Sequence, residues 1–253
     1  MPPDLFSLQG QAALVTGGAS GIGQAIAAAL ARAGADVAVT INSQPADATR
    51  RHVEAAGRRL HEVRADLGRP EAAQRAVAET VAALGRLDIV VNNAGIIRRA
   101  DAVEYAEEDW RAVLDLNLDA VWRLSQAAGS HMLAHGGGKI VNIASLLSFQ
   151  GGIRVPAYAA SKHAVLGLTR ALANEWAARG VNVNAIAPGY IATANTAALR
   201  ADETRNRQIL ERIPAGRWGE PDDLAGAAVF LSSRAADYVH GQVLAVDGGW
   251  MAR

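Results

Sequence analysis

The chain has 253 residues, half of them hydrophobic, so it can bury a substantial core. Lysine plus arginine and aspartate plus glutamate each number 25, so no net positive charge attracts nucleic acid, and we expect no such partner. With no cysteine, the chain has no disulfides, thiolate metal sites or cysteine nucleophile. The start, MPPDLFSLQG, does not resemble a signal peptide, and no apolar run of about 18 residues follows. We therefore expect a cytoplasmic protein that does not contact a membrane.

Seven short apolar segments alternate with longer alanine-rich segments along the chain. They are AALVT, DVAVTI, HEVRA, DIVVN, KIVNIA, VNVNAIA and QVLAVD. Such alternation predicts a mostly parallel sheet with helices on both faces. Six glycines precede these segments at positions where a helix or turn would stop: Gly10, Gly34, Gly57, Gly85, Gly180 and Gly241.

This pattern predicts an α/β protein with a Rossmann fold, a doubly wound sheet of seven parallel strands. No linker or low-complexity tract interrupts it, so we expect residues 1–253 to form a single domain. The alternation breaks only at about 190–220. An insertion of this length after a strand is often a lid over a substrate, which is what we expect here.

The first strand segment runs into TGGASGIGQAIAAAL, residues 16–30. Gly17, Gly21 and Gly23 stand where a strand turns into a helix, and a helix N-terminus offers N–H groups and a positive dipole end to a phosphate. The spacing is TGxxxGxG rather than the usual GxGxxG. We predict that this turn, with Ser20 and Ile22, binds the pyrophosphate of a dinucleotide.

The second strand segment ends at Ile41 and Asn42, where the adenosine ribose of a dinucleotide should lie. An acidic residue there would favour NAD, and a nearby cation would favour NADP. The chain has neither at this strand end, and Ser20 takes the place of a basic residue in the glycine turn. We predict NAD, with NADP as the alternative.

The third and fourth strand segments end in RADLG and VNNAG. Asp66, with Leu67, is a candidate acceptor for the adenine amino group, although a helix N-cap explains this aspartate equally well. Small residues after the fourth strand are expected to form a floor beneath the cofactor: Asn92, Ala94 and Gly95.

Tyr158 and Lys162, in VPAYAASKHAV, lie four residues apart and so share one face of a helix. The sequence also contains TGGASGIG, NNAG, Ser145 and APGYIAT. With this set of motifs, it resembles the short-chain dehydrogenase/reductase family across the whole chain. The resemblance implies an NAD(P)-dependent oxidoreductase acting on a CH–OH group, and a homotetramer.

The resemblance also assigns roles to single residues. Tyr158 is the general acid and base, Lys162 lowers its pKa and holds the nicotinamide ribose, and Ser145 holds the substrate oxygen. Asn117 holds a water that links Lys162 to solvent. The nicotinamide itself packs against the loop after the sixth strand, through Pro188, Gly189, Ile191 and Thr193.

Several segments, ASLLSFQGGIRVPAYAASK among them, resemble a branch of the family that acts on keto and deoxy sugar acids in uronate catabolism. A sugar acid needs cations and hydrogen-bonding groups in its pocket. The candidates are Arg99, Gln150 and Arg154, with Arg154 or Arg99 as the carboxylate clamp. The alternatives are a 3-oxoacyl-thioester reductase, a gluconate or other short-chain alcohol dehydrogenase, and a cofactor-binding sensor without catalysis. We expect no metal, because His131 and His135 have no third ligand in the sequence.

Overall fold

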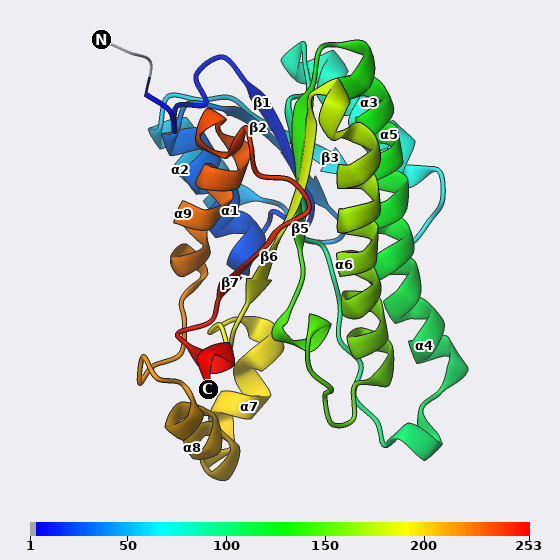
Figure 1. Ribbon diagram of the computed structural model, residues 1–253, viewed down its shortest axis with the longest axis vertical. Coiled ribbons are helices and arrows are strands. Elements are labelled where there is room, and N and C mark those ends of the chain that lie inside the picture. The colour runs from blue at the N-terminus through cyan, green and yellow to red at the C-terminus, as the bar shows by residue number, and fades with distance from the viewer. Residues whose placement is uncertain (1–3) are drawn as a thin grey trace.

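The computed structural model describes residues 4–253. Seven parallel strands form one sheet in the order β3-β2-β1-β4-β5-β6-β7 (Figure 1), so the predicted α/β class and doubly wound sheet are confirmed. The strands are β1 Ala12–Val15, β2 Asp36–Ile41, β3 Leu60–Arg64, β4 Ile89–Asn92, β5 Gly138–Ile143, β6 Val181–Pro188 and β7 Val243–Val246. Strand order reverses between β1 and β4, and a parallel sheet binds its ligand outside the carboxyl ends of the strands at such a point.

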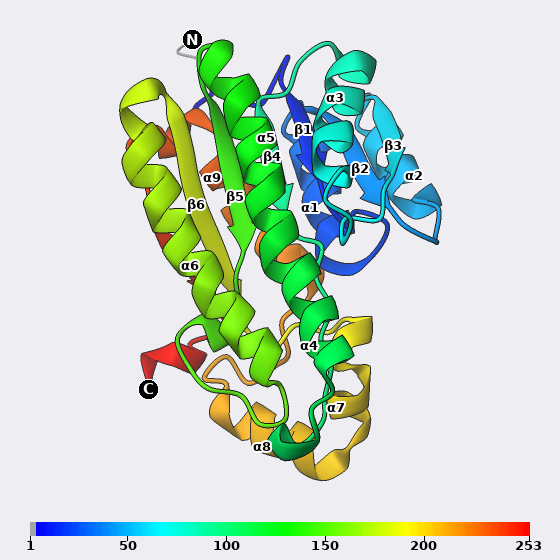
Figure 2. The same ribbon diagram turned by 90° about the vertical axis from the view of Figure 1, so that its right-hand side faces the viewer.

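Helices cover both faces of the sheet. On one face lie α1, α2 and α9, and on the other α3, α5 and α6, with α4 continuing into α5 (Figures 1 and 2). The helices are α1 Gly21–Arg32, α2 Asp47–Ala55, α3 Ala72–Leu84, α4 Glu107–Leu114, α5 Ala120–Ala134, α6 Pro156–Trp176, α7 Ala197–Ala201, α8 Glu203–Arg212 and α9 Ala225–Ser232. Within the described residues, no helix is both long and apolar enough to cross a membrane.

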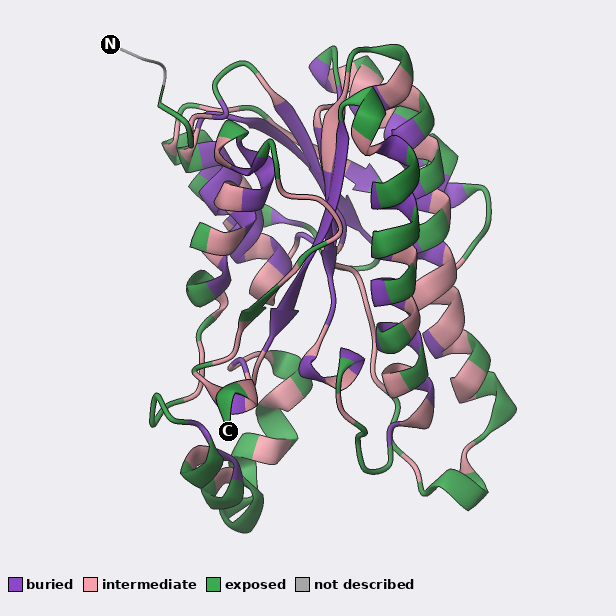
Figure 3. Cartoon of the chain, in the orientation of Figure 1, coloured by how far each residue is buried: buried purple, intermediate pink, exposed green. Residues whose placement is uncertain are grey.

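The central strands are buried along their whole length because both of their faces are covered. Every residue of β1, β2, β4 and β6 is buried (Figure 3). The edge strand β7 is different, since none of its four residues is buried. The sheet is therefore a rigid frame whose loops at the strand ends are free to carry binding groups.

The six glycines predicted to stop a helix or start a turn all have positive φ. Gly85, for example, caps α3 in the left-handed conformation with φ 86°. A side chain disfavours that conformation, which explains the choice of glycine there.

Residues 190–220 leave the sheet after β6 and carry α7 and α8, which lie beyond the carboxyl ends of the strands (Figure 1). The two ends of this segment are pinned together. Ala192 N donates to Gly219 O at 2.7 Å, and Gly219 N donates to Tyr190 O at 2.9 Å. The insertion is thus a loop that is closed at its base.

Candidate active site

The turn between β1 and α1 leaves the first N–H groups of the helix open. Ser20 is the N-cap with extended backbone, its side chain caps no N–H group, and the first helical turn has no acidic residue. A Cβ on Gly18 would lie 2.5 Å from Val39 Cγ1, and one on Gly23 would overlap the carbonyl of Gly17. Open donors beside a backbone without side chains are what a pyrophosphate requires, so the chain fits the predicted dinucleotide.

Two other residues of this turn face different ways. Ile22 is half-buried and packs against the core on the α1 side of the sheet. Gly21 has φ 55°, and a Cβ on it would lie 3.7 Å from Thr193 Cγ2. The glycine turn and the loop after β6 therefore face each other, as both must if one cofactor bridges them.

Thr16 and Asn93 bind the glycine turn to the loop after β4. Thr16 Oγ1 accepts hydrogen bonds from the N–H groups of Asn93 and Ala94, both at 2.9 Å, and Asn93 Nδ2 donates to Thr16 O at 2.8 Å. Neither residue was predicted to act in the site. The signal was present, since Asn93 is the second asparagine of NNAG.

The side chain of Asn92 belongs to the core. It is 2% exposed, and Nδ2 donates to Ser125 Oγ at 3.1 Å and to Asn142 Oδ1 at 2.8 Å. These partners hold the amide among α5 and β5, so the side chain is not available to a cofactor. Ala94 and Gly95 are half-buried, and the floor beneath the cofactor stays a prediction.

Asp66 and Asn42 are exposed at the adenosine end of the site. Asp66 Oδ1 accepts the N–H of Gly68 at 3.2 Å, whereas the N-cap of α3 is Glu71. The N-cap interpretation of Asp66 is therefore wrong. Its carboxylate shapes the turn instead, and Leu67 beside it is buried.

Ser145, Tyr158 and Lys162 come together at the carboxyl end of β5. Ser145 follows this strand, and Tyr158 and Lys162 lie in the first two turns of α6, which Pro156 begins. The Lys162 ammonium is 5.7 Å from the centre of the Tyr158 ring. Ser145 and Tyr158 stand in the wall of a cavity of about 460 Å³.

Lys162 is 4% exposed, and Nζ donates to the carbonyl of Ile143. Their separation is 2.6 Å. Burial lowers the pKa of Lys162 from 10.5 to about 8. That carbonyl is the one acceptor of the ammonium among the described residues, and two N–H donors remain. The arrangement fits the predicted contact with ribose hydroxyls.

Burial raises the pKa of Tyr158 above 10, although a hydrogen bond from Ser145 and the positive charge of Arg99 oppose this shift. Lys162 was predicted to lower the pKa of Tyr158. In the chain without cofactor the pKa is raised instead, because desolvation outweighs the opposing effects. Oxidised nicotinamide would add a positive charge near the phenol, so the lowering of the Tyr158 pKa with the cofactor bound stays a prediction.

Asn117 lies in a π-helical turn, Asp115–Asp119, between α4 and α5, and is fully buried. Its Oδ1 accepts the N–H of Ile96 and its Nδ2 donates to the carbonyl of Ile96, both at 2.8 Å. The side chain thus braces the loop after β4. The predicted water between Lys162 and solvent stays a prediction.

The loop after β6 borders the same cavity. Pro188 and Gly189 line it, and a Cβ on Gly189 would lie 2.6 Å from Asp247 Cα, so only glycine fits there. Ile191 is buried, and Thr193 N donates to Thr196 Oγ1 at 3.1 Å.

Of the three predicted substrate residues, the cavity wall includes Arg99 and Gln150 but not Arg154. Arg154 Nε pairs with Asp101 Oδ1 at 2.8 Å, which holds its guanidinium outside the wall. The structure therefore favours Arg99 over Arg154, and the carboxylate clamp itself stays a prediction. Arg99 reaches across the cavity mouth and donates to Asn195 O at 3.3 Å.

The wall also contains two arginines of α8, Arg205 and Arg212, which sequence reasoning missed. The Arg212 guanidinium lies 4.0 Å from the ring centre of Trp250, whose Nε1 donates to Gln150 Oε1 at 3.1 Å. In the sequence, both arginines belong to the charged run ETRNRQILER, which resembles an ordinary exposed helix. No local signal distinguishes them.

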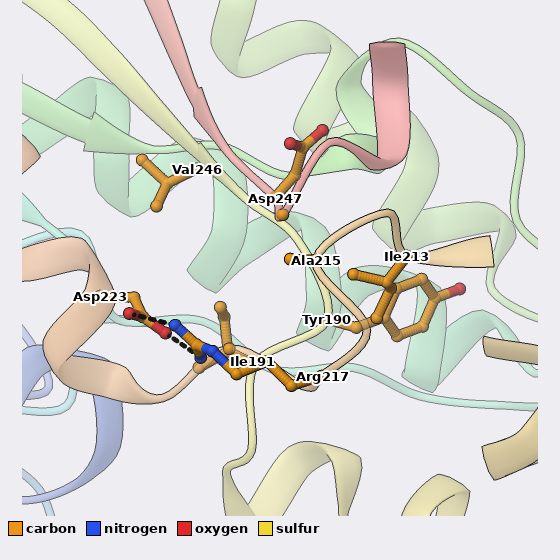
Figure 4. Close-up of a pocket in the computed structure, with 10 residues that line it drawn as sticks. Tyr190, Ile191, Ile213, Ala215, Arg217, Asp223, Val246 and Asp247 are labelled. Atoms are coloured by element: carbon orange, nitrogen blue, oxygen red, sulfur yellow. Dashed lines mark hydrogen bonds and ion pairs between the residues drawn. The ribbon is translucent and has the colours of Figure 1, made fainter. Parts of the chain in front are cut away.

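A second cavity, of about 180 Å³, lies at the base of the 190–220 loop (Figure 4). Its arginine, Arg217, is held by Asp223 through two contacts of 2.7 and 2.9 Å. Ser145 and Tyr158 are not in its wall. The larger cavity is therefore the candidate active site.

Comparison with known proteins agrees with this geometry. A family model described as enoyl-(acyl carrier protein) reductase matches residues 17–251. A 2-dehydro-3-deoxy-D-gluconate 5-dehydrogenase of Bacillus subtilis is 58% identical over 99% of this chain and 98% of its own.

Two solved structures are equally similar. One is a protein of Agrobacterium tumefaciens with bound NADP, described as a 2-deoxy-D-gluconate 3-dehydrogenase; it is 58% identical, with a TM-score of 0.94, over 99% of this chain and 100% of its own. The other comes from Beutenbergia cavernae, holds NADP at low occupancy and is described as an NAD(P)-dependent gluconate 5-dehydrogenase. It is 59% identical, with the same TM-score and coverage. The motifs, the sheet and these relatives agree that the chain belongs to the short-chain dehydrogenase/reductase family of NAD(P)-dependent oxidoreductases.

Proposed function

We propose that this oxidoreductase interconverts a hydroxyl and a ketone on a keto or deoxy sugar acid, as a 2-dehydro-3-deoxy-D-gluconate 5-dehydrogenase of uronate catabolism. The observation that carries the proposal is the wall of the 460 Å³ cavity, which joins Ser145 and Tyr158 to three arginines: Arg99, Arg205 and Arg212. A substrate with a carboxylate and several hydroxyls suits such a wall.

In the reductive direction, the bound nicotinamide supplies a hydride to the carbonyl carbon. Ser145 and Tyr158 bind the carbonyl oxygen, and Tyr158 gives it a proton as negative charge develops there. In the oxidative direction the same phenol oxygen takes the proton from the alcohol. Lys162, with its two remaining N–H donors, orients the nicotinamide ribose and stabilises the phenolate.

The substrate carboxylate is assigned to Arg99 and Arg212, which line the cavity without a carboxylate partner among the described residues. Stacking on Trp250 fixes the plane of the Arg212 guanidinium. A guanidinium held in one plane can bind a carboxylate with two parallel hydrogen bonds.

Residues 190–220 act as the lid of this single domain. The β-bridge between Ile191 and Gly219 holds the two ends of the segment together. Helix α8 places Arg205 and Arg212 in the cavity wall. A movement of α8 toward the sheet would therefore bring both arginines to the substrate and, at the same time, exclude water from the cavity.

Two alternative functions, an acyl-thioester reductase and a non-catalytic sensor, predict other features of the cavity. An acyl-thioester reductase needs an apolar channel for its chain, whereas this wall adds three arginines and Gln150 to its apolar residues. A non-catalytic sensor has no need of a buried lysine next to a tyrosine in the cavity wall. The first alternative fits the description of the matching family model, and a substrate assay separates both alternatives from our proposal.

NAD is the proposed cofactor because neither Ile41 nor Asn42, at the end of β2, carries a positive charge, and NADP is retained as a second cofactor. We also propose a cytoplasmic homotetramer. The edge strand β7 is uncovered, with Leu244 39% exposed, and Trp122 on α5 is 40% exposed, so both elements offer apolar surface for packing. Light scattering should give about four times the chain mass of 26.4 kDa, and a monomer mass at all concentrations would refute the tetramer.

The proposed activity is tested by following absorbance of NADH and NADPH with four compounds: the 2,5-diketo-3-deoxy acid, its amide, 5-ketogluconate and an acetoacetyl thioester. We expect the highest kcat/KM with the free deoxy acid. Preference for the thioester would support an acyl reductase, and binding of cofactor without turnover of any compound would support the sensor.

A further inference from the structure

Arg64, the last residue of β3, lies beside the end of β2. The parallel register pairs Ile41 of β2 with Arg64, and Arg64 Nη1 donates to the backbone carbonyl of Asn42 at 3.0 Å. In dinucleotide-binding sheets, the residues at the end of β2 meet the adenosine ribose. An acidic residue there binds the 2′-hydroxyl of NAD, and a nearby arginine accommodates the 2′-phosphate of NADP. This chain has no acid at that place, but the sheet supplies an arginine.

The Arg64 guanidinium has capacity for an anion. It is exposed, and among residues 4–253 none of the ion pairs includes it. A guanidinium has five N–H donors, and the bond to Asn42 uses one. By contrast, Arg50 on the adjoining α2 pairs with Glu62 at 2.8 Å and is already neutralised.

A residue of α3 also binds the backbone of Arg64. Arg75 on α3 donates from Nη2 to the carbonyl of Arg64 at 3.0 Å. The contact fixes the end of β3 and brings a second positive charge close to the same place.

We propose that Arg64 binds the 2′-phosphate of NADP and lets this oxidoreductase use NADP as well as NAD. The sequence interpretation found no cation at the end of β2, which is true of Ile41 and Asn42 themselves. The cation comes instead from the neighbouring strand, 22 residues further along. The Agrobacterium and Beutenbergia proteins bind NADP, and Arg64 is the residue of this chain that we assign to its phosphate.

Nucleotide fragments test this inference by binding alone, without substrate or turnover. Calorimetry would compare adenosine 2′,5′-bisphosphate with AMP, two probes that differ only in the 2′-phosphate. We expect the wild type to bind the bisphosphate more tightly. The Arg64→Gln variant should lose about tenfold in affinity for the bisphosphate, the usual worth of a charge-assisted hydrogen bond, and change less than about twofold for AMP.

Arg32→Gln is the matched control, because it removes the same charge from an exposed arginine at the far end of α1. It should change neither affinity by more than about twofold. Equal affinity of the wild type for both probes, or a loss in Arg64→Gln that is the same for both, would overturn the proposal. If the variant did not fold, the wild type alone would still decide: its preference for the bisphosphate must shrink as salt rises from about 0.05 to 0.5 M.

Discussion

The guanidinium of Arg212 lies 4.0 Å from the ring centre of Trp250, with Arg212 in the lid segment and Trp250 in the last turn of the chain. This stack holds a cation in the wall of the cavity that contains Ser145 and Tyr158. The indole is held in turn by Gln150. The carboxylate site that we propose is thus assembled from three segments that are distant in sequence.

Replacing Arg212 with glutamine should raise KM for the free acid by about tenfold, because a charge-assisted hydrogen bond is lost. The same change should alter KM for the neutral amide less than about twofold. Arg154→Gln is the control, since Arg154 pairs with Asp101 outside the wall. Steady-state kinetics that showed the larger effect in Arg154→Gln would restore the original interpretation of Arg154.

Tyr158→Phe should lower kcat by at least about a hundredfold, because the ring is kept and only the transferable proton is removed. The Kd for NADH, measured by fluorescence titration, should change less than about twofold. A variant that kept more than about a tenth of the wild-type rate would show that Tyr158 is not the acid.

Lys162 predicts an unusual dependence of stability on pH. Burial lowers its pKa from 10.5 to about 8, so between these values the unfolded chain binds more protons at this residue than the folded chain. The free energy of unfolding should therefore rise with pH through this window, by up to about 3 kcal/mol if fully titrated. The raised pKa of Tyr158 opposes this rise only above about pH 10.

Urea unfolding between about pH 7.5 and 9.5 measures this slope. The chain has two lysines, so Lys139→Met serves as the control and should keep the rise, while Lys162→Met should abolish it. A wild-type stability that fell with pH in this range would contradict a lysine buried with a lowered pKa.

Asn42→Asp should shift the cofactor ratio toward NAD. The new carboxylate would accept a hydrogen bond from the ribose, repel a 2′-phosphate and pair with Arg64. We expect the ratio of kcat/KM for NAD to that for NADP to rise about tenfold. Ile41 is a poor site for this test, because it is 5% exposed and an aspartate there would bury its charge. An unchanged ratio in Asn42→Asp would place the ribose elsewhere.

The sequence predicted the sheet well because local patterns determine it. Gly85 marks the end of α3, and the apolar run of β1, AALV, reflects burial on both faces. The pairing of Tyr158 and Lys162 could be predicted equally well, because it follows from their spacing on one helix. What escaped prediction depends on contacts between distant segments.

The arginines illustrate this limit. Arg154 was one of two predicted carboxylate clamps, but it forms an ion pair with Asp101 of another loop. Arg64 and Asn42 meet only because β2 and β3 are neighbours in register. Asn92 and Asn93 are adjacent in the chain, yet one faces the core and the other the glycine turn. A composition pattern does not specify such partners.

The most direct measurement follows the hydride itself. NADH carrying deuterium at C4 of the nicotinamide, as each of its two stereoisomers, would be incubated with the 2,5-diketo-3-deoxy acid, and the product examined by NMR. We predict that one stereoisomer delivers its deuterium to C5, that the C2 ketone is untouched, and that Tyr158→Phe prevents the transfer. Deuterium at C2, or no transfer from either stereoisomer in the wild type, would contradict the assignment of this chain as a 5-dehydrogenase of the deoxy sugar acid.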